Sequence, residues 1–298
     1  MNMIIDLCAY GLVRLLGLLP MWLLYAIGGI IGRIMWWTNS DSAKISRINL
    51  AICYPQLSEK ERNQIARASV LEMGTILIES IAVWCKPFEK AFEHRVLSFQ
   101  GKSLLDEALQ NNRPVVLIAS HFGNYEVLYL LVHKLIGNIS LLYRPIKLKR
   151  LGAFILKSRG KHGGHMMPTN REGITRFCEA VKHPDGVVAI AGDLVPSRER
   201  GDFVSFFGAP TLSPHFPTDL VRNSNAIALC IHMVRVKNNR FKVVLEEFPE
   251  DIYSEDKKLA TQAMMQGIEK IVAANPEQYA WSYKRFKRMP NGEKLYKK

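Results

Sequence analysis

Residues 114–136 read PVVLIASHFGNYEVLYLLVHKLI, and this stretch decides the fold of the chain. Its first part, 114–120, is a short apolar run rich in β-branched residues, which is typical of a buried strand. Its last part, 125–136, carries apolar residues at helical spacing. His121 and Gly123 lie between the two parts, so the chain is expected to turn there from a strand directly into a helix.

Similar strand patterns recur along the chain and alternate with helical patterns. Further strands are predicted at 139–145, 186–193, 226–236 and 241–248. Helices are predicted within 41–95 and at 171–182 and 256–274. This alternation predicts an α/β fold with a mixed, largely parallel central sheet flanked by helices. The apolar stretch FFGAPTLSP at 206–214 is expected to be a loop, either covering the site or packing on the core.

The composition is that of a globular protein with anionic partners. The chain has 298 residues, of which 48% are hydrophobic and 22% charged, and 40 Lys and Arg against 27 Asp and Glu give a net charge of +13. Such a surplus favours phospholipid headgroups, nucleic acid or acidic proteins as partners. The five cysteines are widely spaced and form no CxxC, so neither a disulfide framework nor a zinc site is expected. GxGxxG, Walker A and GxSxG motifs are absent from the sequence.

The N-terminal region contains an uncharged run long enough to cross a bilayer core. The run is 15–32, and basic residues lie on both sides of it, more of them after it. We expect residues 1–38 to form a hydrophobic membrane-anchor helix and 39–298 a separate domain on the cytoplasmic side. Pro20 either kinks a spanning helix or marks the turn of a hairpin in one leaflet. The alternatives are a buried helix of a soluble core and a cleaved signal peptide, which the acidic Asp6 disfavours.

His121 and Glu126 are the candidate catalytic pair. Their spacing places them on different faces of a continuous helix, so the pair requires His121 on the turn before the helix. There the carboxylate is expected to bind one imidazole nitrogen and leave the other as a general base. Backbone N–H groups at the helix start are expected to help hold an oxyanion. The alternative is a histidine with an unrelated glutamate nearby, since the bare motif is expected by chance about once in a chain of this composition.

Basic residues gather between 141 and 176, where nine Arg or Lys accompany one acid. Most of them fit a solvated face near anionic lipid, and Arg144 and Arg159 are assigned to a phosphorylated substrate. Arg144, His121 and Asp193 all lie at or just past the ends of predicted strands. Because ligands gather at the carboxyl ends of parallel strands, one site is expected to hold all three.

Four short motifs together resemble the bacterial lipid A late acyltransferases. They are HFGNYE at 121–126, YRP at 143–145, FFG at 206–208 and PEQYAWSYKRFK at 276–287. The resemblance implies transfer of an acyl chain from acyl carrier protein to a hydroxyl of a lipid A precursor, a phosphorylated glucosamine lipid, at the cytoplasmic face of the bacterial inner membrane. It implies neither a metal nor a cofactor.

The resemblance also implies roles for individual residues. His121 is the base and Glu126 its orienting partner, while Arg144 and Asp193 fall on positions that look like substrate contacts. Asn124, within the HFGN turn, is also assigned to substrate. The chain departs from the family pattern at Tyr125, where Trp is frequent, and after Asp193, where Leu and Val replace Gln-Asp. The second departure leaves the acceptor open.

Two other functions compete with this one. The first is acyl transfer to another lipid hydroxyl, such as a phosphoglycerol or an aminolipid. The second is a basic, membrane-bound nucleic-acid-binding protein. The basic stretch offers only Tyr143 and Phe154 as aromatic residues on which bases stack, so no nucleic acid partner is expected.

Overall fold

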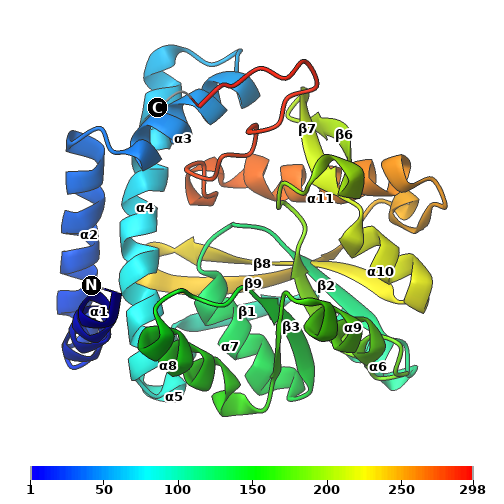
Figure 1. Cartoon of the computed structure of the whole chain (residues 1–298), viewed down its shortest axis with the longest axis horizontal. Helices are drawn as coiled ribbons and strands as arrows, with labels where there is room; N and C mark the ends of the chain where they lie inside the picture. Colours follow the sequence, from blue (N-terminus) through cyan, green and yellow to red (C-terminus); the bar gives the residue numbers. More distant parts are fainter. Residues whose placement is uncertain (1, 297–298) are drawn as a thin grey trace.

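A seven-stranded sheet forms the centre of the computed structural model, which describes residues 2–296 (Figure 1). The strand order is β1-β9-β8-β2-β5-β3-β4, and within this sheet only β8 and β9 pair antiparallel. The strands β6 and β7 form a separate antiparallel hairpin. The strands are β1 (Val96–Gln100), β2 (Val115–Ala119), β3 (Ile139–Tyr143), β4 (His165–Pro168), β5 (Val187–Ala191), β6 (Gly201–Phe206), β7 (Ala209–Pro214), β8 (Ile227–Val236) and β9 (Arg240–Glu247).

Helices cover both faces of the sheet. The α-helices are α1 (Asn2–Leu16), α2 (Met21–Trp37), α3 (Asp41–Cys53), α4 (Glu59–Cys85), α5 (Phe88–Ala91), α6 (Lys102–Gln110), α7 (Tyr125–Ile136), α8 (Lys149–Arg159), α9 (Arg171–Ala180), α10 (Phe216–Ser224) and α11 (Lys257–Ala274). Figure 1 shows α10 and α11 on one side of the sheet and α6 and α7 on the other.

Successive side chains of β2 enter two separate cores, as the alternation of a strand requires. Val116 and Ile118 pack with α9, α10 and α11. Val115 and Leu117 pack with α6, α7 and the end of α4. A strand buried on both faces explains why its sequence is a continuous apolar run.

The predicted fold class is confirmed. Each of the five predicted strands is present, and α9 and α11 occupy the predicted helical stretches 171–182 and 256–274. Helices α3 and α4 lie within the predicted helical region 41–95, and a capping box between Ser58 and Glu61 begins α4. The expectation of a loop at 206–214 is wrong. This stretch forms most of the β6–β7 hairpin, and its Phe206 and Leu212 are fully buried.

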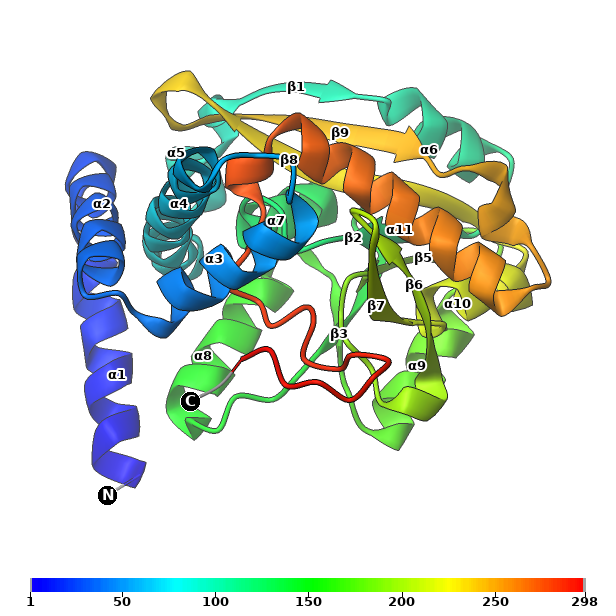
Figure 2. The ribbon, with the colours of Figure 1, turned by 90° about the horizontal axis from the view of Figure 1, so that it is seen from above.

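The N-terminal apolar run is two helices instead of one. The chain breaks between α1 and α2, where Pro20 takes the N-cap position of α2 with an extended backbone. Figures 1 and 2 show that the two helices run in clearly different directions. Of the two possibilities stated for Pro20, the structure shows a turn between two helices and not a kinked single helix, because a proline is accommodated at a helix start more easily than inside a helix.

A set of exposed apolar side chains follows α1, the turn and α2. Its members are Met3, Ile4, Ile5, Leu7, Leu12, Leu15, Leu18, Trp22, Ile30, Ile34 and Trp37. Contiguous exposed apolar surface marks a protein or membrane contact. These helices are therefore compatible with a membrane anchor.

Helix α4 lies between α2 and the sheet (Figure 2). Within the described chain it is the one helix long and apolar enough to cross a membrane, but half of its most apolar stretch is buried inside the protein. Gly74 of α4 meets Gly28 and Gly32 of α2, and a Cβ added at Gly74 would lie 2.4 Å from the Gly28 carbonyl oxygen. The two backbones therefore pack in direct contact. The domain boundary between residues 38 and 39 stays a prediction.

Candidate active site

The HFGN turn places His121 at the carboxyl end of β2, directly before α7. Gly123 has a positive φ of 60°, and a Cβ at this position would lie 2.2 Å from the Met233 carbonyl oxygen. Only glycine fits this combination of conformation and space. The turn is held from the other side by residues near the C-terminus, because Gly123 N–H donates to the Gln278 carbonyl and Ala280 N–H donates to the His121 carbonyl.

Asp193 binds His121 twice. Its Oδ1 lies 2.8 Å from Nδ1 of the imidazole, and its Oδ2 accepts the backbone N–H of His121 at 2.9 Å. Asp193 follows β5, the neighbour of β2 in the sheet, so two parallel strands bring the pair together at one edge. The carboxylate is fully buried, whereas 29% of the His121 side chain is exposed. Because Nδ1–H faces Asp193, Nε2 is the nitrogen available to accept a proton.

Two tyrosines from the C-terminal segment complete this arrangement. Tyr279 donates its hydroxyl to Asp193 Oδ2 at 2.9 Å. The ring of Tyr283 stacks on the imidazole with a centroid distance of 5.2 Å and an interplanar angle of 10°, and its hydroxyl accepts the backbone N–H of Val195. The imidazole is therefore fixed by a carboxylate at its edge and an aromatic ring on its face.

The charges of this pair support each other. The negative charge of Asp193 raises the pKa of His121 above its ordinary value, against the lowering effect of burial. Burial would raise the pKa of Asp193, but the charge of His121 and the hydrogen bonds from its ring and backbone outweigh it and hold that pKa at about 2. Asp193 therefore stays ionised over the whole physiological pH range.

The expected hydrogen bond between His121 and Glu126 is wrong. Glu126 lies in the first turn of α7, but its carboxylate accepts hydrogen bonds from Nε and Nη2 of Arg159 and, at 3.1 Å, from the Trp84 indole N–H. With its side chain only 2% exposed, Glu126 instead holds Arg159 at the end of α8. The imidazole finds its carboxylate 72 residues away in the sequence, at Asp193.

Asn124 is also placed differently from the expectation of a substrate contact. Its side chain is buried, and Oδ1 caps α7 by accepting the backbone N–H groups of Glu126 and Val127. Its Nδ2 donates to Glu79 at 2.7 Å, and Glu79 in turn binds Arg235 through both oxygens. Asn124 therefore fixes the start of α7 and does not face a ligand.

Several backbone N–H groups around the start of α7 are already engaged. Those of Glu126 and Val127 bind Asn124, that of Gly123 binds Gln278, and that of His121 binds Asp193. These four groups therefore do not form an oxyanion site, and an oxyanion site at the helix start stays a prediction.

A groove lies between the end of β3 and α8, and the ion pair of Arg159 with Glu126 links it to the first turn of α7. Its accessible volume is about 160 Å³. It combines apolar side chains with three cations, and its lining residues are Tyr143, Arg144, Pro145, Ile146, Lys149, Gly152, Ala153, Ile155, Leu156 and Arg159. Arg144 and Arg159, the two cations predicted to bind substrate, thus line one groove.

The family sequence pattern for bacterial lipid A biosynthesis acyltransferases matches residues 2–288. This chain belongs to that family. A lipid A biosynthesis palmitoleoyltransferase of Escherichia coli is 27% identical over 277 residues, which cover 92% of this chain and 88% of that protein. A lipid A biosynthesis lauroyltransferase of the same organism is 23% identical over 287 residues, covering 95% and 91%. A lipid A biosynthesis acyltransferase of Haemophilus influenzae is 25% identical over 258 residues, covering 84% and 78%.

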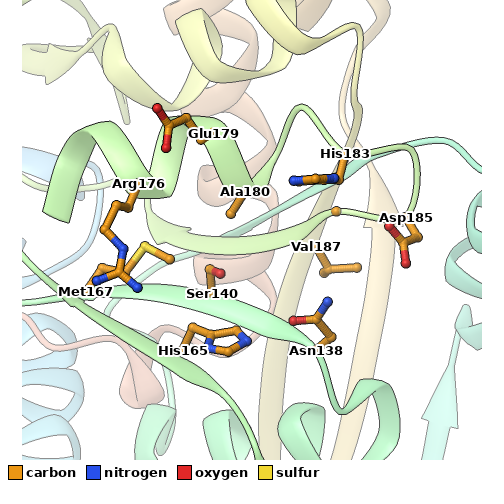
Figure 3. Close-up of a pocket in the computed structure, with 11 residues that line it drawn as sticks. Asn138, Ser140, His165, Met167, Arg176, Glu179, Ala180, His183, Asp185 and Val187 are labelled. Atoms are coloured by element: carbon orange, nitrogen blue, oxygen red, sulfur yellow. The ribbon is translucent and has the colours of Figure 1, made fainter. Parts of the chain in front are cut away.

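A second hollow of this acyltransferase lies at the opposite edge of the sheet, near the starts of β3 and β5. Its accessible volume is about 370 Å³. Figure 3 shows His165 at the start of β4, Arg176 on α9, and His183 and Asp185 on the loop before β5 around it. None of the six residues predicted for the site lines it. The larger hollow is therefore separate from the His121–Asp193 pair.

Sequence reasoning missed the contribution of the C-terminal segment to the site. Tyr279 and Tyr283 lie within PEQYAWSYKRFK, a motif that carried the family resemblance but gave no role to either ring. No periodicity or spacing connects this segment with His121. Its position follows from the pairing of Phe122 with Tyr279, a contact between residues far apart in the chain.

Proposed function

We propose that this acyltransferase moves a fatty acyl chain from acyl carrier protein to a hydroxyl of a lipid A precursor, with His121 as general base. The pairing of His121 with Asp193 is the observation that supports this proposal most strongly. A buried, ionised carboxylate fixes Nδ1 as the protonated nitrogen, so Nε2 is free to take the hydroxyl proton. Asp193, first assigned to substrate, takes the orienting role first assigned to Glu126.

The reaction requires no covalent enzyme intermediate. The acceptor oxygen attacks the thioester carbonyl while Nε2 of His121 removes its proton, and the resulting imidazolium is stabilised by Asp193. The C–S bond then breaks. A thiol has an ordinary pKa near ~8.5, so the sulfur leaves as a stable anion or takes the proton from His121.

The groove with Arg144 and Arg159 supports a phosphorylated acceptor. Arginine binds phosphate through parallel N–H donors, and Glu126 with Trp84 fixes the direction of the Arg159 guanidinium. The His121–Asp193 pair can deprotonate a hydroxyl, and the cationic groove can bind phosphate. Together they suit a hydroxyl that is carried on a phosphorylated lipid.

The membrane and the donor are supported by surface features. The exposed apolar residues of α1 and α2 suit contact with a bilayer, and basic residues follow them in the sequence, which favours the cytoplasmic face of the inner membrane. The C-terminal stretch 281–298 has seven Lys or Arg against one Glu, and its exposed Lys284, Lys287 and Lys294 suit contact with an acidic carrier protein.

The test is to incubate membranes containing the full chain with labelled acyl-carrier-protein substrate and three acceptors: a lipid A precursor, a phosphoglycerol lipid and an aminolipid. The proposal expects label on the lipid A precursor and none with His121→Ala. Label on one of the other two lipids, again dependent on His121, would move the function to the alternative acceptor. Label that persists in the His121→Ala membranes would overturn the assignment of the base.

A further inference from the structure

Arg285 is a buried cation in the core of the acyltransferase. Its side chain is 2% exposed, and none of the salt bridges among the described residues includes it. A buried charge without a bound counter-charge is costly, so its presence calls for a reason.

The contacts of Arg285 are neutral. Nη1 donates to the carbonyl oxygens of Leu212 at 3.1 Å and Leu194 at 3.5 Å. Nη2 donates to Ser213 Oγ and lies 3.3 Å from Met265 Sδ, whereas Nε has no hydrogen-bond partner among residues 2–296. These contacts hold the guanidinium firmly, but they do not neutralise its charge.

The position of Arg285 relates it to the catalytic pair. Leu194, which it binds, is the residue that follows Asp193. Arg285 belongs to the same C-terminal segment as Tyr279 and Tyr283, which hold Asp193 and His121. The groups in contact with the imidazole are Asp193 after β5, Tyr125 at the start of α7, and Tyr283. Tyr279 contacts Asp193, and Arg285 lies one residue beyond it, at the Leu194 carbonyl.

We propose that Arg285 is a positioning residue of the acyl-transfer site, whose buried charge beside the Leu194 backbone limits the protonation of His121 that Asp193 favours, so that the imidazole remains available as a base. The positive charge opposes the protonation of His121 and favours the ionised form of Asp193. The negative charge of Asp193 favours the protonated imidazole, whereas the positive charge of Arg285 favours the uncharged imidazole. A carboxylate bound to Arg285 would cancel this second effect, which explains why none of the described salt bridges includes Arg285.

The proposal rests on the proposed function only through the role of His121 as base. The test therefore measures the imidazole directly and needs no substrate. Diethyl pyrocarbonate acylates uncharged imidazole only. The detergent-solubilised full chain is treated with it between about pH 5 and pH 9, and modification of His121 is followed by peptide mass spectrometry. His183, at the opposite edge of the sheet (Figure 3), is the internal reference.

Arg285→Met removes the charge, so the pH at which His121 modification reaches half of its maximal rate, its midpoint, should move upward. Near pH 7 the modification should be slower by roughly threefold or more. Arg285→Lys keeps the charge but loses the fork of donors, and its midpoint should stay near that of the wild type. The midpoint of His183 should stay constant in both variants.

Two substitutions at Ser213 keep the proposal testable if Arg285→Met does not fold. Ser213→Asp gives Arg285 a carboxylate in contact, which neutralises its charge in place and should raise the His121 midpoint. Ser213→Ala removes a hydrogen bond without changing charge and should leave the midpoint unchanged. A purely structural Arg285 would lower thermal stability in the Met and Lys variants alike without moving the midpoint, and this outcome would overturn the proposal. If the midpoints shift as expected but the full chain transfers no acyl group, the proposed function fails and the role of Arg285 stands.

Discussion

Asp193 and Glu126 are two buried carboxylates at the same edge of the sheet, and they have different partners. Asp193 binds an imidazole and a tyrosine hydroxyl, whereas Glu126 binds a guanidinium and an indole N–H. The first carboxylate can stabilise a proton that arrives and leaves during a reaction. The second holds a permanent cation in one direction. The comparison shows that nearness to a histidine in the sequence does not decide which carboxylate serves it.

The largest effect is expected at the imidazole pair. His121→Ala should lower kcat by about 10²–10⁴-fold because it removes a general base, and Asp193→Asn should approach the same loss because it removes the partner that fixes the imidazole. Initial rates with acyl-carrier-protein substrate and a lipid A precursor measure both. His183→Ala is the matched control, since this histidine is exposed at the opposite edge, and it should retain full activity.

Glu126→Gln should act on the acceptor and leave the base intact. Loss of the charged partner frees Arg159, so the KM for a phosphorylated acceptor should rise roughly tenfold while kcat changes less. Arg159→Gln should do the same, and the double variant should cost less than the sum because both changes remove one interaction. If Glu126→Gln abolished kcat as fully as His121→Ala, the two carboxylates would not have separate roles.

Asn124→Ala tests a third buried carboxylate, Glu79, which accepts a hydrogen bond from Asn124. Glu79 is a partner of neither Asp193 nor Glu126. The change removes the cap of α7 and one partner of Glu79, so stability should fall by about 1–2 kcal/mol. Thermal unfolding measures this loss, and acceptor KM at a temperature where the variant is folded should stay near that of the wild type. A raised KM with unchanged stability would instead return Asn124 to the substrate.

The smallest effect is a displacement of the pH profile. Because Asp193 raises the pKa of His121, the acidic limb of kcat/KM should lie above about 6.5, and residual activity of Asp193→Asn should show this limb at lower pH. His121 and Asp193 affect the stability of the fold with opposite dependence on pH. The contribution of protonated His121 is lost as pH rises through its raised pKa, and that of Asp193 is lost as pH falls toward about 2. A wild-type limb at or below 6.5 would contradict the pairing.

The strands and the position of the site were predictable because they depend on local pattern. The apolar runs of β2, β3, β5, β8 and β9 stand out from their surroundings, and the edge where His121 and Asp193 meet follows from the parallel arrangement of β2 and β5. The partner of His121 was not predictable, since the choice between Glu126 and Asp193 depends on side-chain directions at a turn. The β6–β7 hairpin was missed because its buried Phe206 and Leu212 lie beside Gly and Pro residues that are common in loops.

The glycine contact between α2 and α4 has a consequence for any attempt to make this enzyme easier to handle. Helix α4 supplies Trp84 to Glu126, Glu79 to Asn124 and, through Ser69, a hydroxyl to the backbone of Tyr279. Helix α2, which would be removed to obtain a water-soluble fragment, packs on the outside of α4. Helix α4 in turn holds residues of the candidate active site in place. A fragment beginning at residue 39 lacks α2 and should therefore lose turnover, because α4 loses this support.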